Sequence, residues 1–146
     1  MNVAKQVFIE LEGVVADIDH RAFYKSDFVE YNRRAEDDKP FPYIKTFLDA
    51  LNEQYDIIIF SMRQERFRVL TEDWLIANEI PCEELILKRY GETRPHNETV
   101  LSWIQHRHNG STKRALYNVE FIMVNNESTV ETLREEGFTV FQTNWS

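Results

Sequence analysis

Five short apolar runs, separated by segments of helical periodicity, constrain the fold of this chain more than any other feature. The runs lie at residues 7–11, 57–60, 85–87, 121–124 and 139–141. Continuous apolar strands are typical of a parallel sheet with helices on both faces, because both faces of each strand are then buried. The pattern predicts an α/β, three-layer Rossmann-like fold with a central parallel sheet of about five strands.

The intervals between these runs carry the apolar spacing of amphipathic helices. Helices are predicted over residues 23–34, 44–51 and 67–77, from just after Pro95 to residue 104, and in a final segment. Ser128 and Glu131 have the spacing of a capping box for that final helix, and Gly137 would end it. Repeats and long linkers are absent, so we expect a single domain over residues 1–146.

The composition predicts a globular, cytoplasmic protein. The chain has 146 residues, 42% of them hydrophobic, and a net charge of -8, which disfavours loose coating of nucleic acid. The lone Cys82 fits a reducing compartment, and no signal segment or membrane span is recognisable, so no membrane partner is expected. The four histidines are scattered without the spacing of a metal site.

Polar residues at the ends of the predicted strands define a candidate site, since ligands of open parallel sheets bind beyond the carboxyl ends of the strands. The residues at these ends are Glu10 and Glu12, Ser61 and Arg63, Lys88 and Arg89, and Asn125 and Asn126. Two carboxylates one residue apart, followed by Gly13, are typical of a metal-dependent phosphate-handling site.

An ordered series of motifs points to a known family. The series comprises residues 7–17, His20 and Arg21, residues 60–65, 71–75 and 91–94, Val124 to Asn126, and residues 136–138. It resembles the haloacid dehalogenase-like (HAD) superfamily and, within it, the phosphatase domain of bacteriophage polynucleotide kinase. The resemblance covers roughly residues 7–142 and implies a HAD fold with a minimal cap.

The resemblance assigns roles to the acidic pair. Family members use an Asp nucleophile at the position of Glu10 and an Asp general acid and base at the position of Glu12. A magnesium ion, if bound, would be held by Glu10, Glu12 and Asn125. Ser61, Arg63, Arg21 and Arg94 would contact phosphate, since serine hydroxyls and guanidinium groups both donate to phosphate oxygens.

The catalytic motifs are nevertheless degenerate. Both acids are Glu where the family has Asp, and a shift of about 1 Å can cost on the order of 100-fold in rate. The neutral Asn125 and Asn126 replace acidic magnesium ligands. No Lys lies between Lys88 and Lys113, although the family places one at or near Val100. We therefore expect a pseudoenzyme without a cofactor, in which Glu10 and Glu12 are structural remnants.

Two functions remain open. The first is a binding or inhibitory module, of bacteriophage origin by resemblance, which engages a protein partner or a nucleic-acid or nucleotide phosphate. The alternative is an active magnesium-dependent phosphatase on nucleotide or polynucleotide 3′-phosphates that uses Glu10 and Glu12. A negative surface that mimics nucleic acid is a third, weaker reading of the acidic charge.

The basic and aromatic residues also allow two interpretations. Arg21, Arg63 and Arg94, with Lys88 and Arg89, form one basic patch or else pair with nearby glutamates. Aromatic side chains of the cap either stack on nucleobases or pack the cap onto the core. Trp145 near the C-terminus either serves an interface or packs back on the sheet.

Overall fold

The structure, a computed structural model, describes residues 4–144, so that Trp145 lies outside the described residues. The central sheet has five parallel strands in the order β5-β4-β1-β6-β7. Their bounds are β1 Gln6–Glu10, β4 Asp56–Gln64, β5 Glu84–Lys88, β6 Val119–Val124 and β7 Val140–Gln142. The predicted three-layer α/β architecture and the five predicted strands are confirmed.

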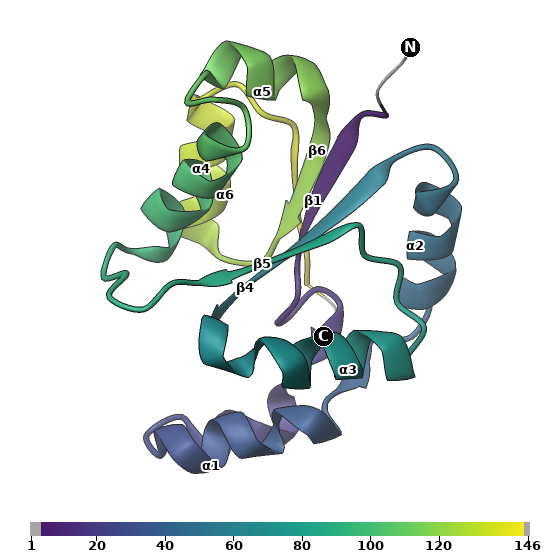
Figure 1. Cartoon of the computed structure of the whole chain (residues 1–146), viewed down its shortest axis with the longest axis vertical. Helices are drawn as coiled ribbons and strands as arrows, with labels where there is room; N and C mark the ends of the chain where they lie inside the picture. Colours follow the sequence, from purple (N-terminus) through teal and green to yellow (C-terminus); the bar gives the residue numbers. More distant parts are fainter. Residues whose placement is uncertain (1–3, 145–146) are drawn as a thin grey trace.

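Helices cover both faces of the sheet, with α4, α5 and α6 on one side and α2 and α3 on the other (Figure 1). The α-helices are α1 Phe28–Arg33, α2 Ile44–Asn52, α3 Arg68–Ala77, α4 His96–His106, α5 Thr112–Asn118 and α6 Glu127–Glu135. The 3₁₀ segments are η1 Asp19–Tyr24, η2 Arg34–Asp37 and η3 Glu65–Phe67. In the described chain, no helix has the length and apolarity needed to cross a membrane.

Two apolar cores result from the alternation of side chains along the strands. On β1, Val7 and Ile9 pack with the residues of α2 and α3, whereas Phe8 packs with those of α4 and α6. Strand β4 repeats the pattern, with Ile57 and Ile59 in the first core and Ile58 in the second. The strands are therefore apolar without interruption because each residue faces one of the two cores.

The segment after β1 forms the cap. It contains η1, α1, η2 and a small antiparallel pair, β2 Ala16–Asp17 with β3 Lys39–Pro40. Helix α1 lies beyond the end of the sheet where β1 stops (Figure 1). Residues 23–34, predicted as one helix, are divided between η1, α1 and η2. Asp27 causes the interruption, because its side chain caps α1 by accepting from the Glu30 backbone N–H.

The start of α6 corrects the predicted capping box. Asn126 is the N-cap, and its side chain accepts from the backbone N–H of Thr129. Ser128 lies inside the first turn, so the Ser128–Glu131 prediction was wrong by two positions. The helix ends as predicted. Its C-cap residue is Glu136, and the next residue, Gly137, has a left-handed backbone with a φ of 99°.

Candidate functional site

The acidic pair lies where β1 ends and the chain turns. Glu10 is the last residue of β1, and Glu12 follows in a tight loop in which the Gly13 N–H donates to the Ala16 carbonyl. Gly13 has a φ of 82°, and a Cβ there would lie 3.3 Å from the Asn125 Nδ2. The loop thus needs glycine both for its left-handed backbone and for the close approach of Asn125.

Glu10 is paired with a histidine that the sequence did not indicate. Glu10 is buried, and its Oε2 lies 2.5 Å from the Nε2 of His96, the first residue of α4. The His96 Nδ1 lies 2.5 Å from the Thr129 Oγ1, and this hydroxyl donates to the Asn126 Oδ1. A chain of polar contacts thus runs from Glu10 through His96 to the N-cap residue of α6.

Helix α4 therefore supplies an imidazole ring to the site from its first residue. The family resemblance places a Lys at or near Val100. This residue is buried in the apolar core that also contains residues of α6. Asn126, expected among the polar strand ends, uses its amide oxygen as the cap of α6. The side chain next to Glu10 is thus a histidine at the start of α4, and not a Lys at or near Val100.

Glu12 is held through both carboxylate oxygens. The Ser61 hydroxyl donates to its Oε1 at 2.6 Å, and the Arg63 Nε lies 2.7 Å from its Oε2. The second contact is an ion pair without the alignment of a hydrogen bond. The Arg21 Nη2 lies 3.9 Å from the same oxygen. Ser61 and Arg63, both on β4, are therefore directed at Glu12.

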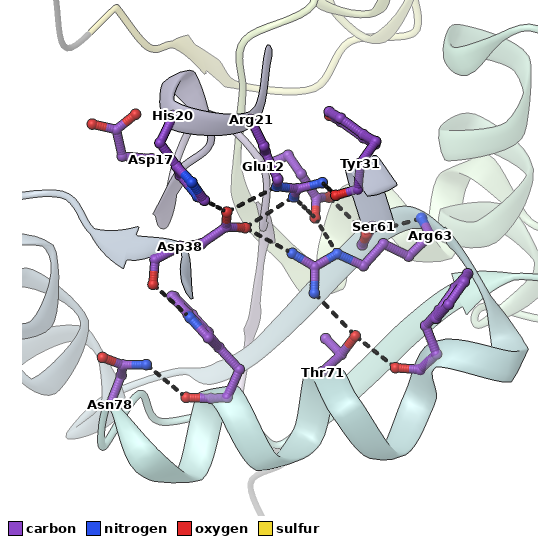
Figure 2. Close-up of polar contacts among 12 residues, drawn as sticks. Glu12, Asp17, His20, Arg21, Tyr31, Asp38, Ser61, Arg63, Thr71 and Asn78 are labelled. Atoms are coloured by element: carbon purple, nitrogen blue, oxygen red, sulfur yellow. Dashed lines mark hydrogen bonds and ion pairs between the residues drawn. The ribbon is translucent and has the colours of Figure 1, made fainter. Parts of the chain in front are cut away.

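Asp38 is the centre of a second cluster, in which three basic side chains meet one carboxylate (Figure 2). Arg21 donates to both oxygens, at 2.8 and 2.9 Å, and the Arg63 Nη2 donates at 3.1 Å. The His20 Nε2 lies 2.6 Å from the Asp38 Oδ1. Only 1% of Arg21 and 4% of Asp38 are exposed, so these charges depend on each other.

This cluster connects the cap to the core. Arg63 also donates to the Thr71 Oγ1 on α3 at 3.1 Å, and the Trp74 indole donates to the Asp38 carbonyl at 2.8 Å. Arg21 also lies over the ring of Tyr31 on α1, 4.3 Å from its centroid. Burial raises the pKa of Tyr31. We call Arg21, Asp38 and Arg63 the cap latch.

The predicted basic residues lie in two separate places. Arg21 and Arg63 belong to the buried cap latch. Arg94 donates to Glu92 from Nε and Nη2, and with Arg89 it lines a cavity on the flank of the sheet. Of the cap aromatics, Phe23 and Tyr43 are almost fully exposed, at 89% and 87%.

The donor set at the strand ends suits a magnesium ion poorly. Magnesium prefers near-octahedral oxygen ligands, usually carboxylates that are free to coordinate. Here His96 competes for Glu10, while Ser61 and Arg63 occupy both oxygens of Glu12. Within residues 4–144, no group of three His, Cys, Asp or Glu side chains is arranged to hold a metal.

Fold and site together define an α/β protein of the HAD type, with an acidic pair after the first strand and a small cap. The family model of the polynucleotide kinase PNKP phosphatase domain matches residues 4–146. The chain belongs to this family. No curated protein sequence matches the chain.

Solved structures share the fold. A chain of the Pnkp1/Rnl/Hen1 complex is 23% identical, with a TM-score of 0.75 over 98% of this chain and 47% of that one. This chain thus spans about half the length of that relative. A HAD-family enzyme from Bacteroides thetaiotaomicron, in complex with magnesium and inorganic phosphate, is 13% identical, with a TM-score of 0.63 over 99% and 96% of the two chains. A haloacid dehalogenase-like hydrolase from Streptococcus pneumoniae is 15% identical, with a TM-score of 0.67 over 98% and 86%.

Proposed function

We propose that this chain is a catalytically degenerate member of the PNKP phosphatase family that acts as a binding module for a protein partner. The pairing of both acids with basic side chains carries the proposal. A nucleophile must present an unshielded oxygen to phosphorus, and a general acid and base must exchange protons freely. Glu10 is instead tied to His96, and Glu12 to Ser61 and Arg63.

The missing electrostatic groups add to this argument. Phosphoryl transfer needs positive charge on the transferring group, usually from a metal ion and a Lys. The guanidinium groups near the acids, on Arg21 and Arg63, are directed at carboxylates of the protein, and the His96 imidazole contacts Glu10. These side chains could therefore contact a substrate only after their contacts with the carboxylates were broken.

A protein partner is supported by the relatives and by the surface. The similar chain of the Pnkp1/Rnl/Hen1 complex belongs to a multiprotein assembly. In this chain, large apolar side chains are exposed on the cap and on α3, among them Phe23, Val29, Val69 and Ile76. Exposed apolar surface of this kind is typical of protein interaction sites.

An assay of phosphate release tests the loss of catalysis. We expect the protein to release no more phosphate from a 3′-phosphorylated oligonucleotide, with magnesium or manganese, than its Glu10→Gln variant does. The physical reason is that Glu10 and Glu12 stay paired when substrate is added. Release above the level of Glu10→Gln would contradict the proposal and favour the alternative, a metal-dependent phosphatase that uses Glu10 and Glu12.

One observation favours that alternative. Both positions keep a carboxylate, and the Glu12 Oε2 and Arg63 Nε face each other at 2.7 Å without an aligned hydrogen bond. A substrate phosphate that drew Arg63 away would free this oxygen. The Glu12→Gln variant separates the two cases, because it would lower activity only if that oxygen takes part in proton transfer.

A further inference from the structure

A cavity of about 610 Å³ is lined mainly by residues of strand β5, of helix α4 and of the loop between them. We call it the flank cavity. Of the residues assigned to catalysis, phosphate or metal from the sequence, only Arg94 lines it. Its volume is within the range of roughly 300–1,000 Å³ that small-molecule sites occupy.

The apolar lining of the flank cavity comes from the edge strand β5 and from helix α4. Strand β5 is at the edge of the sheet and pairs only with β4. The Leu85 carbonyl accepts from Arg68, and Ile86 and the half-buried Trp103 add apolar surface. The ring of Trp103 packs against that of Phe60, at 6.2 Å between centroids, which fixes its orientation. A flat heteroaromatic ring suits this lining, since it can stack on the Trp103 indole and form hydrogen bonds with the outer edge of β5.

The rim of the flank cavity is basic in an otherwise acidic protein. Four arginines (Arg68, Arg89, Arg94 and Arg107) and three glutamates line it, which leaves a formal charge of +1, whereas the whole chain carries -8. His106 adds a group that becomes positive on protonation. A local positive site of this kind attracts a small anion.

Three of the arginine side chains have N–H groups that donate no hydrogen bond to the protein. The Arg89 side chain is exposed and makes no hydrogen bond or ion pair within the described residues, and only its backbone carbonyl accepts, from the Glu92 N–H. Arg94 is fixed by Glu92 through Nε and Nη2, so its Nη1 remains available. Arg107 is fixed by Glu84 through Nη1, and its buried Nε has no hydrogen-bond partner. Arg94 and Arg107, which are already held by glutamates, lose little freedom when they bind phosphate, whereas Arg89 contributes a guanidinium group that no carboxylate occupies.

We propose that the flank cavity binds a nucleoside phosphate, with the base against Trp103 and the open edge of β5 and the phosphate at Arg89 and Arg94. The ligand is either a free mononucleotide or the terminal nucleotide of a strand, which share this chemistry. Neither Glu10 nor Glu12 lines this cavity. It does not rest on the proposed loss of phosphatase activity, and Arg89 lies outside the paired acids on which that proposal depends.

Titration of the whole protein with adenosine 5′-monophosphate, followed by ¹⁵N NMR, tests the site. The Trp103 indole signal, assigned with a Trp103→Phe variant, should shift. Arg89→Ala should weaken binding about 10-fold or more, the effect of one lost charge-assisted hydrogen bond. Arg114→Ala is the matched control, because Arg114 is also exposed but does not line the cavity, and it should change affinity less than about 2-fold.

Several outcomes would overturn the proposal. These are an unshifted Trp103 signal at about 10 mM nucleotide, equal affinities for the protein and its Arg89→Ala variant, and equal affinities for inorganic phosphate and the nucleotide. The two sources are separated by a short oligonucleotide with a terminal phosphate. Tighter binding of the oligonucleotide identifies a strand end, and tighter binding of the mononucleotide identifies a free nucleotide. Both results support the site.

Discussion

Three glutamates have lowered pKa values because an arginine donates to each carboxylate. Arg33 lowers the pKa of Glu30, and Arg68 lowers that of Glu65. Arg94 lowers the pKa of Glu92 from 4.5 to about 2. The ion pair at the rim of the flank cavity therefore stays charged at every pH at which the protein is normally handled.

The Glu92 carboxyl should titrate with a midpoint near pH 2 in the folded protein, measured by ¹³C NMR. Because the folded pKa is lowered, the stabilisation from this pair is present above pH 4.5 and disappears as the pH falls through about 2. In an Arg94→Gln variant, the midpoint should move back toward 4.5. An unchanged midpoint in that variant would show that Arg94 is not the cause.

The residues that complete the site were beyond prediction from single motifs. His96 and Glu10 are 86 positions apart, and Asp38 is 17 from Arg21 and 25 from Arg63. Sequence position indicated Glu10, Glu12, Ser61 and Arg63, because each stands at or just after the end of an apolar run, although β4 itself continues to Gln64. Nothing local distinguishes Asp38 from a loop acid, or His96 from the other histidines, since only the packed fold brings their partners to them.

Helix α6 shows how a strand end determines the start of the next element. Strand β6 stops at Val124, and Asn126 caps α6 two residues later. The same Asn126 oxygen accepts from the Thr129 hydroxyl, which contacts His96. The cap therefore contributes both to the helix and to the arrangement of the site.

Replacement of Asn126 by Ala should lower the free energy of unfolding by about 1 kcal/mol or more, because the Thr129 N–H loses its acceptor. Urea denaturation measures the change. Ser128→Ala is the control, since Ser128 is exposed inside the first turn, and it should stay within about 0.5 kcal/mol of the parent protein. A decrease in the free energy of unfolding of Ser128→Ala by more than about 0.5 kcal/mol would favour the capping box of Ser128 and Glu131.

The elements missed in the sequence are the short ones. Helix α5 buries only Ala115, and it begins at the Ser111 cap without an apolar stripe. Strands β2 and β3 have two residues each, too few to show alternation. The longer strands were predictable because their side chains face two apolar cores, which requires an uninterrupted run of apolar residues.

The cap latch links the cap to the core through buried polar contacts. Arg21 and Asp38 belong to the cap, Arg63 to the sheet, and Thr71 and Trp74 extend the contacts to α3. Removing one partner from such a buried cluster leaves a charge without compensation. The stability of the whole molecule should therefore depend on this small group of side chains.

Arg21→Met should lower the free energy of unfolding by about 3–5 kcal/mol, because the Asp38 carboxylate keeps its charge but loses its two-pronged donor. Equilibrium urea unfolding gives the value. Arg33→Met, which breaks a largely exposed pair with Glu30, is the matched control and should cost less than about 1 kcal/mol. Equal losses for the two variants would mean that the latch contributes no more than a surface pair.

The mutual pairing of Glu12, Ser61 and Arg63 has an evolutionary consequence. Each side chain has a length that suits the other two, so a change at one position alters the selective value of a change at the next. Shortening Glu12 to Asp would withdraw its oxygens and leave Arg63 partly without a counter-charge. We therefore expect substitutions at these three positions to be epistatic, because a single change breaks contacts that a second change would have to restore.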